Sequence, residues 1–323
     1  MKLDLNKINW KTDFDSTALA VFNYQYNNVS VYKTFCDHLK RTPKTVCKVL
    51  DIPFLPIQFF KEKALISKEK ISEIIFSSSG TTGAITSKHY VADLSLYEAS
   101  FTTAFEQQYG AISDYCILAL LPSYLEKGGS SLVYMADKLI KDSHHPQSGF
   151  FLNDLNALAE ILKIQEAAGQ KTLLIGVSYA LLDLIEHETF NLNNTIVMET
   201  GGMKGRRKEL IKQELHAKLS KGLGVQNIHS EYGMTELLSQ AYSTGQGIFN
   251  CPPWMKVLTR EPEDPLQLIK GKTGGINIID LANVYSCSFI ATQDLGKIAS
   301  NGSFEIIGRF DNSDIRGCNL MVF

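Results

Sequence analysis

Hydrophobic and polar residues form a repeating block pattern through the middle of the chain. Apolar runs without polar alternation predict strands that are covered on both faces, at 115–121, 172–177, 195–199 and 225–228. Between these runs, apolar residues recur at the spacing of one helix face, which predicts helices at 132–140, 151–168, 179–188 and 208–219. Strands that alternate with helices are typical of an α/β fold with a parallel sheet and crossover helices.

The pattern changes from about Ser243 onward. Proline and glycine now separate short strand-like runs, such as 275–280 and 303–307, which predicts a small antiparallel β subdomain. We therefore expect an α/β core at 1–242, a β-rich subdomain at 243–311 and a C-terminal tail at 312–323. Residues 1–70 combine short helical patterns with an extended proline-containing segment and indicate no chemistry of their own.

Composition narrows the class of protein. The chain has 323 residues, of which 44% are hydrophobic and 20% charged, as in ordinary globular proteins. Its net charge of -2 argues against a nucleic-acid partner. The N-terminus lacks the apolar core of a signal peptide, and the most apolar run is too short to cross a bilayer, so we expect a cytoplasmic protein without a membrane span. Six cysteines without Cys-x-x-Cys spacing indicate neither a zinc site nor a disulfide framework.

Polar residues gather where the predicted strands end. In parallel sheets, ligands bind beyond the carboxyl ends of the strands, which here fall at 122–124, Ser178, 200–205 and 230–236. A further segment, 76–83, carries five hydroxyls and two glycines directly after an apolar pair. Glycine lets backbone N–H groups turn toward an anion and hydroxyls add donors, so this segment is suited to phosphate. A hydroxyl-rich surface turn is the simpler alternative, and no Gly-Lys-Ser/Thr sequence makes it a Walker A loop.

Four segments in order resemble the core motifs of the adenylate-forming superfamily, which includes acyl-CoA ligases and acyl-protein synthetases. They are 77–83, 232–236, 292–296 and 308–311. Within that superfamily the chain is most similar, from about residue 70 onward, to the LuxE-type acyl-protein synthetases of bacterial bioluminescence, on the segments 78–83, 87–90, 199–206 and 315–320. The resemblance implies the large N-terminal domain of these enzymes as the fold.

The resemblance also implies ATP and Mg²⁺ as cofactors and a carboxylic acid, expected to be a fatty acid, as the substrate. Thr235 would hold the α-phosphate and Glu236 the Mg²⁺, while Tyr232 would stack on adenine and Asp294 and Arg309 would contact the ribose. The remaining residues of the implied nucleotide site are Ser78, Ser79, Gly80, Thr81, Thr82, Gly83, Gly201, Gly202 and Gly233. Taken singly, Tyr232 also reads as a core aromatic, Glu236 as a helix N-terminal charge and Asp294 as a turn residue.

The sequence ends at Phe323, where the resemblance would place a hinge and a mobile lid that carries a catalytic lysine. We therefore expect the charge on the transferred phosphate to be met by a partner protein or by another cation, the candidates being Lys88, His89, Lys204, Arg206 and Arg207. In acyl-protein synthetases a cysteine near the C-terminus accepts the acyl group, which points to Cys318 beside Arg316. The alternative is that Cys318 merely adjoins the hinge motif. An acyl-carrying or reductase partner is implied by the resemblance alone.

Three other functions stay open at this point. The chain can be an acyl-CoA ligase, or a nucleotide- or acyl-adenylate-binding subunit that is inactive without a partner. It can also be a serine thioesterase, because the sequence 176–180 approaches the Gly-x-Ser-x-Gly nucleophile elbow around Ser178. That segment lacks the final glycine, and no histidine follows His229, so the thioesterase is the least favoured.

Overall fold

The computed structural model describes residues 10–78, 85–122, 129–201, 207 and 210–310. Several residues named above lie outside this part of the chain and remain predictions from the sequence: Ser79, Gly80, Thr81, Thr82, Gly83, Gly202, Lys204, Arg206, Arg316 and Cys318. Within the described residues, no helix combines the length and apolar character that crossing a membrane requires.

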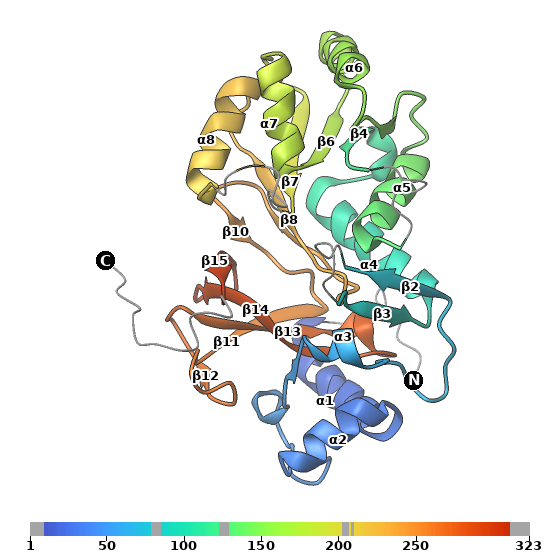
Figure 1. The fold of residues 1–323 in the computed structure, drawn as a ribbon, viewed down its shortest axis with the longest axis vertical. Helices are drawn as coiled ribbons and strands as arrows, with labels where there is room; N and C mark the ends of the chain where they lie inside the picture. The colour runs from blue at the N-terminus through green and yellow to red at the C-terminus, as the bar shows by residue number, and fades with distance from the viewer. Residues whose placement is uncertain (1–9, 79–84, 123–128, 202–206, 208–209, 311–323) are drawn as a thin grey trace.

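The first of the two large sheets has six strands, and most of them are parallel (Figure 1). This confirms the predicted parallel sheet. Only the last strand runs antiparallel to its neighbour. In spatial order the strands are β5 (Gly149–Phe150), β4 (Cys116–Leu120), β6 (Thr172–Val177), β7 (Thr195–Thr200), β8 (His229–Tyr232) and β9 (Ala241–Ser243). Every residue of β4 and β6 is buried, as expected for strands that are covered on both faces.

Helices cover both faces of this sheet (Figure 1). On one side lie α4 (Leu94–Tyr109) and α5 (Ser131–Ser143). On the other side lie α7 (Ser178–His187) and α8 (Lys212–Leu223), while α6 (Leu155–Ala168) connects β5 to β6. Polar residues just before α4, α5 and α6 cap the helices, because their side-chain oxygens accept hydrogen bonds from backbone N–H groups of the first turn; these are Asp93, Ser130 and Asp154.

Two predicted boundaries are wrong near α8. The helix expected at 208–219 begins at Lys212 and continues to Leu223, where Gly224 ends it in the left-handed conformation with φ 68°. The strand expected at 225–228 begins at His229 instead. The apolar residues before His229 belong to the connection after Gly224, so the periodicity alone placed the strand too early. As a result, Tyr232 lies in β8 rather than beyond its end.

The second large sheet is built mainly from the last third of the chain and is largely antiparallel. This confirms the predicted change of architecture after the parallel sheet. Its strand order is β10 (Ile248–Phe249), β15 (Phe304–Arg309), β14 (Phe289–Ile298), β13 (Gly274–Asp280), β11 (Met255–Arg260) and β12 (Leu268–Ile269). A separate hairpin pairs β2 (Ile74–Ser77) with β3 (Lys88–Val91).

The N-terminal part of the chain packs against the second sheet (Figure 1). Strand β1 (Leu55–Pro56) pairs in parallel with β14, and helices α1 (Trp10–Asn28) and α2 (Ser30–His38) lie beneath it. The buried Gln25 side chain of α1 donates to the backbone oxygens of Asn283 and Val284 at 3.0 Å. The short helices are η1 (Val49–Asp51), α3 (Phe59–Glu62), η2 (Ile112–Asp114) and η3 (Leu281–Asn283). Residues 10–70 therefore support the second sheet.

Candidate active site

Three residues of the predicted nucleotide site meet where the two large sheets approach each other. The Tyr232 hydroxyl at the end of β8 donates to Oδ2 of Asp294 at 2.7 Å. The Arg309 Nε of β15 donates to Oδ1 of the same carboxylate at 2.9 Å. The Asp294 side chain is 8% exposed and that of Arg309 is 71% exposed. The carboxylate is therefore held from two sides at the edge of the protein, and its ligand stays a prediction.

An aromatic cluster fixes the Tyr232 ring. Its centroid lies 5.8 Å from that of Phe249 and 5.5 Å from that of Phe304, the latter in an edge-on arrangement. Phe249 and Phe304 stack on each other at 5.4 Å. Burial raises the pKa of Tyr232 well above its usual range, and the neighbouring Asp294 carboxylate adds to this effect, so the hydroxyl stays protonated and remains a donor.

The loop that follows β8 carries Thr235 and Glu236, and buried side chains hold its backbone from below. Asn283 donates from Nδ2 to the backbone oxygen of Glu236 at 2.8 Å. The buried His89 of β3 lies with Nδ1 at 2.8 Å from the backbone oxygen of Thr235 and with Nε2 at 3.0 Å from Oδ1 of Asn283. The loop is thus tied both to the β2–β3 hairpin and to η3.

His89 is fully buried, with both ring nitrogens already facing oxygen atoms. Burial lowers its pKa to about 4, against the opposing effect of its hydrogen bonds with Thr235 and Asn283. The ring is therefore neutral near neutral pH and carries no charge toward a phosphate. Its predicted catalytic role stays a prediction, and the geometry favours a positioning role for the Thr235–Glu236 loop.

Asp280 and Asn283 support this loop, and neither was predicted from the sequence. Asp280 is fully buried, and its Oδ2 accepts hydrogen bonds from the backbone N–H groups of Leu238 at 2.8 Å and Ser239 at 3.0 Å. Its Oδ1 accepts from the Ser239 hydroxyl. The available signal was an aspartate at the end of a predicted buried strand, where a charge without a partner is costly.

Glu236 carries a carboxylate, which is a suitable ligand for Mg²⁺. Burial raises its pKa, and a hydrogen bond with Ser87 opposes that rise. The described residues hold no group of three or more His, Cys, Asp or Glu side chains arranged around a metal. Mg²⁺ in phosphoryl-transfer sites is bound through one or two carboxylates together with the substrate's phosphates, so a single carboxylate is sufficient. A bound Mg²⁺ would supply positive charge against the phosphates.

A second buried carboxylate, Glu199, lies at the end of β7. Its Oε1 accepts a hydrogen bond from the Ser230 hydroxyl at 2.8 Å and forms an ion pair with Nζ of Lys212 at 2.9 Å. The Nε2 atom of His216 lies 3.5 Å from the same oxygen. Burial by itself raises the pKa of Glu199, but the His216 hydrogen bond and the Lys212 charge outweigh it and lower the pKa to about 2. Glu199 is thus a fully paired anion that joins α8 to the sheet.

Ser178 and Gly201 lie together beside Glu199. Ser178 is buried, and its hydroxyl donates to the backbone oxygen of Gly201 at 3.1 Å and faces Oε2 of Glu199 at 3.4 Å. A nucleophilic serine needs a base that accepts its proton, usually a histidine, and in the described structure this hydroxyl faces oxygen atoms instead. The geometry therefore disfavours the serine thioesterase.

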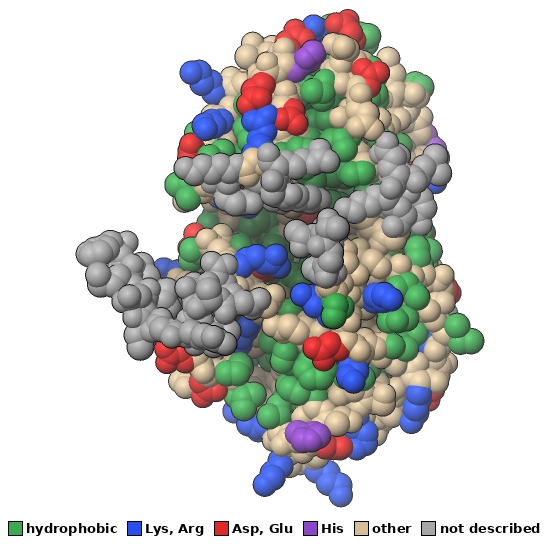
Figure 2. Space-filling view, in the orientation of Figure 1, with side chains coloured by type: hydrophobic (Ala, Val, Ile, Leu, Met, Phe, Trp, Pro, Cys, Tyr) green, Lys and Arg blue, Asp and Glu red, His purple; other side chains and the backbone are tan. Residues whose placement is uncertain are grey.

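Lys88 and Arg207, two described cations that could pair with a phosphate, differ in their exposure and in their ion pairs. Lys88 is exposed, at the start of β3. Arg207 forms ion pairs with Asp183 and, at 2.6 Å, with Glu186 of α7. Lys and Arg side chains are mixed with Asp and Glu over the described part of the face in Figure 2, in keeping with the small net charge.

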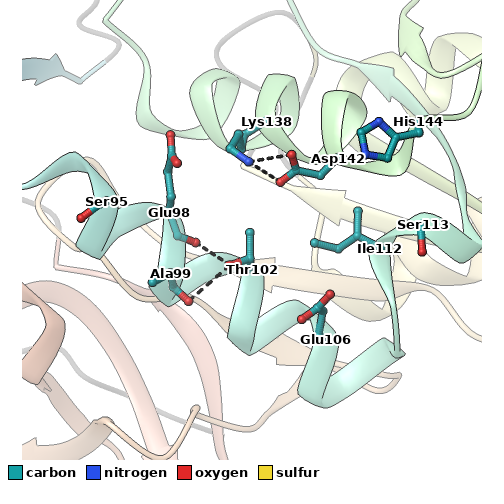
Figure 3. Close-up of a pocket in the computed structure, with 10 residues that line it drawn as sticks. All are labelled: Ser95, Glu98, Ala99, Thr102, Glu106, Ile112, Ser113, Lys138, Asp142 and His144. Carbon is teal, nitrogen blue, oxygen red and sulfur yellow. Dashed lines mark hydrogen bonds and ion pairs between the residues drawn. The ribbon is translucent and has the colours of Figure 1, made fainter. Parts of the chain in front are cut away.

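An open groove of about 660 Å³ lies between α4 and α5, apart from the residues discussed so far (Figure 3). Within it, Lys138 and Asp142 of α5 form an ion pair. Its wall consists of Ser95, Glu98, Ala99, Thr102, Glu106, Ile112, Ser113, Lys138, Asp142 and His144. None of the described site residues predicted from the sequence is among them, so this groove is separate from the described part of the predicted nucleotide site.

Comparison with solved structures tests the fold. ATP-bound MatB from Rhodopseudomonas palustris matches with a TM-score of 0.54 and 21% identity, over 73% of this chain and 47% of MatB. The open conformation of 2-hydroxyisobutyryl-CoA ligase, in complex with 2-HIB-AMP and CoA, matches with a TM-score of 0.65 and 12% identity, over 92% of this chain and 74% of the ligase. This chain has the fold of an acyl-CoA ligase. The same ligase in its thioesterification state gives 0.67 and 13% identity, over 97% and 74% of the two chains.

These matches confirm the predicted fold class. The chain spans about half the length of the MatB chain, 47%, so the activity of the longer proteins does not transfer with the fold. No protein-family model matches the sequence, and no curated protein matches it.

Proposed function

We propose that this protein activates a carboxylic acid with ATP, forming an acyl-adenylate and pyrophosphate. The observation that carries the proposal is the meeting of Tyr232, Asp294 and Arg309 beside the end of β8, from which the Thr235–Glu236 loop continues. These are residues that the four sequence motifs assign to one nucleotide, although they come from three different strands. Two proteins of the same fold bind ATP and 2-HIB-AMP, respectively.

The proposed reaction is a substitution at phosphorus. A carboxylate oxygen attacks the α-phosphorus of ATP, a new P–O bond forms, and the bond to the β-phosphate breaks, so that pyrophosphate leaves with the electron pair. The attack brings anions together, and catalysis requires donors and cations around the phosphates. Asp294 would accept hydrogen bonds from the ribose hydroxyls, replacing those from Tyr232 and Arg309. The buried support from His89, Asn283 and Asp280 would keep the Thr235–Glu236 loop in place.

Exchange of labelled pyrophosphate into ATP tests this proposal directly. The wild type is expected to catalyse exchange that depends on an added carboxylic acid. Glu236→Gln is expected to lower the exchange rate by about a hundredfold, because it would weaken binding of the Mg²⁺ that offsets the negative charge on the phosphates. Glu263→Gln, an exposed carboxylate in the loop between β11 and β12, is the matched control and is expected to retain the wild-type rate. Exchange without acid, or equal rates for both variants, would contradict the proposal.

The fate of the acyl group is a finer proposal that rests on the resemblance. We propose that a protein thiolate attacks the acyl carbon, forming a thioester and releasing AMP, with Cys318 as the candidate acceptor. Incubation with ATP and the labelled acid that performs best in the exchange assay, followed by a denaturing gel, would show label on the wild type and none on Cys318→Ala. Hydroxylamine should strip the label. Formation of acyl-CoA on addition of CoA, with the protein unlabelled, would instead identify CoA as the acceptor.

A further inference from the structure

The β7–β8–β9 end has a face that packs on α4, and some polar atoms of this face lack partners within the described structure. We call it the α4 face; its residues are Thr200, Glu231, Gln240 and Tyr242. Side chains alternate along strands, and Glu231 lies directly opposite Tyr242 in the β8–β9 pairing. Gln240 precedes β9 and shares the side of Tyr242, whose ring packs on Tyr109 of α4 at 5.5 Å.

Two oxygen atoms on this face are buried without a hydrogen-bond partner among the described residues. Gln240 and Tyr242 are each 4% exposed, and in the described part of the chain neither the Oε1 of Gln240 nor the Tyr242 hydroxyl has a hydrogen-bond partner. Leaving a buried polar group unpaired costs about 1–3 kcal/mol, so such pairs of atoms are uncommon in a finished protein core. A ligand that pairs with such an atom is one physical explanation for it.

Glu231 closes the cluster toward the strand ends. Its Oε2 accepts a hydrogen bond from the Thr200 hydroxyl at 2.6 Å. Its Oε1 lies against Gly233: a Cβ at that glycine would stand 2.3 Å from Oε1 and 3.3 Å from Cγ of Gln240. The missing side chain at Gly233 thus lets the carboxyl group and the Gln240 chain come together. Glu231 is partly exposed, so the cluster is not completely closed to solvent.

The chemistry of the cluster defines what it would bind. Gln240 Oε1 and Glu231 Oε1 are oxygen atoms that accept hydrogen bonds, and the Tyr242 hydroxyl also accepts. A plain alkyl chain would leave Gln240 Oε1 and the Tyr242 hydroxyl without a partner. A primary ammonium group donates three hydrogen bonds and matches them most completely, while a hydroxyl group satisfies one or two. Lys212 forms an ion pair with Glu199 on the opposite face, and its charge also opposes the rise that burial causes in the pKa of Glu231.

We propose that the α4 face is the part of the acid-binding site that selects the substrate, and that the acid carries a hydrogen-bond-donating group, an amine in the best case, rather than a plain fatty chain. This inference rests on the proposed acid activation and names the class of its substrate. A site whose buried polar groups must be paired rejects an analogue that lacks the pairing group much more strongly than an apolar pocket rejects a methylene. The α4 face would therefore reject acids that lack a hydrogen-bond donor.

The test compares acids of equal length in pyrophosphate exchange. One set is propionic acid, lactic acid and alanine; a second is butyric acid, γ-hydroxybutyric acid and γ-aminobutyric acid; a third is octanoic acid with its ω-hydroxy and ω-amino derivatives. In at least one set, the donor-bearing acid is expected to exceed the plain acid by at least about tenfold in kcat/KM. Plain acids that equal or exceed their substituted analogues in all three sets would overturn the inference.

Tyr242→Phe and Gln240→Leu are expected to reduce that preference by several-fold, because each removes one of the oxygens. The matched control is Tyr97→Phe, which removes a buried hydroxyl that is already paired, with the backbone oxygen of Ser131 at 2.9 Å. The control should keep the wild-type preference. A preference that is unchanged in both Tyr242→Phe and Gln240→Leu would overturn the inference even if donor-bearing acids are favoured.

A second measurement separates this inference from the proposed function. Thermal shift of the wild type is recorded with the same acids without ATP. If no acid supports exchange, acid activation by the isolated protein fails. In that case, the inference is supported if donor-bearing acids raise the melting temperature and if Tyr242→Phe weakens this increase. It fails if the plain acids raise the melting temperature equally.

Discussion

The two faces of the β7–β8–β9 end differ in how completely their polar groups are paired. On the face toward α8, which we call the α8 face, Glu199 is bonded by Ser230 and Lys212, and Tyr232 is bonded to Asp294. On the α4 face, Gln240 and Tyr242 each have an oxygen without a hydrogen-bond partner among the residues that the structure describes. The same strands therefore carry a closed network on one side and an incomplete one on the other. The closed network is organised to hold its own shape, whereas the incomplete one requires a further group.

The two glutamates show the same contrast in their ionisation. Glu199 is held as an anion, whereas burial raises the pKa of Glu231 to about 7, against the lowering effect of its hydrogen bond with Thr200. Neighbouring carboxyl groups with separated pKa values divide the acid and base forms between them. Stability and its pH dependence therefore give a direct way to test the comparison.

The largest effect is expected from Glu199→Gln. The pKa of Glu199 is lowered to about 2 from an ordinary value near 4.5, so its stabilisation is fully present above pH 4.5 and is lost as the pH falls toward 2. The shift corresponds to roughly 3 kcal/mol in the free energy of unfolding. Urea unfolding of wild type and variant is expected to differ by this amount at pH 7 and to converge in acid.

Glu214→Gln provides the control for that experiment. Glu214 pairs with Lys218 on the same helix at 3.1 Å, with both side chains about half exposed, at 49% and 52%. An exposed pair of this kind contributes about 0.3–0.5 kcal/mol. A Glu199 variant that costs no more than Glu214→Gln would show that the α8 face is not the stabilising network described above.

Glu231→Gln is expected to act in the opposite direction. The pKa of Glu231 is raised above its ordinary value, so the folded protein is favoured below pH 4.5 and loses stability as the pH rises through about 7. The variant cannot ionise and should be more stable than the wild type at pH 8.5, by roughly 2 kcal/mol after allowance for partial exposure. Equal stabilities at pH 6 and pH 8.5 would remove the ionisation contrast between the two faces.

Asp294→Asn is expected to weaken ATP binding by about tenfold, since an amide replaces a carboxylate that accepts two hydrogen bonds. Isothermal titration calorimetry measures the affinity. Arg309→Met is a comparison variant for the free energy of unfolding. It is expected to change this energy little, because the Arg309 side chain is 71% exposed and its ion pair contributes little to folding. Unchanged ATP affinity in Asp294→Asn would separate this carboxylate from the nucleotide.

The smallest effects come from removing single hydroxyls. Tyr232→Phe loses a hydrogen bond to Asp294 and is expected to lower the free energy of unfolding by about 1 kcal/mol. Tyr242→Phe removes an unpaired hydroxyl and is expected to leave stability unchanged or slightly increased. Differential scanning calorimetry at pH 7 compares the two melting temperatures. The reverse order would mean that the Tyr242 hydroxyl is paired in solution.

The pattern of the sequence predicts the parallel sheet well, because strands covered on both faces leave a clear apolar signal, as at 172–177 for β6. It placed β8 too early, because apolar residues after Gly224 are buried without belonging to a strand. The motifs identified Tyr232, Asp294 and Arg309, which the fold brings together. The support of the Thr235–Glu236 loop was not predictable, because His89 and Asn283 lie 194 positions apart and only the tertiary fold makes them neighbours.

The pairing of β1 with β14 also constrains the order in which a nascent chain completes its fold. Leu55 and Pro56 lie opposite Ile290 and Ala291, and the α1 side chain of Phe22 packs on Phe289 at 6.4 Å. Helices α1 and α2 and strand β1 are therefore synthesised well before the strand β14 that covers their apolar side. During that interval their apolar side chains are exposed to solvent, and contacts of such long sequence separation slow the docking step.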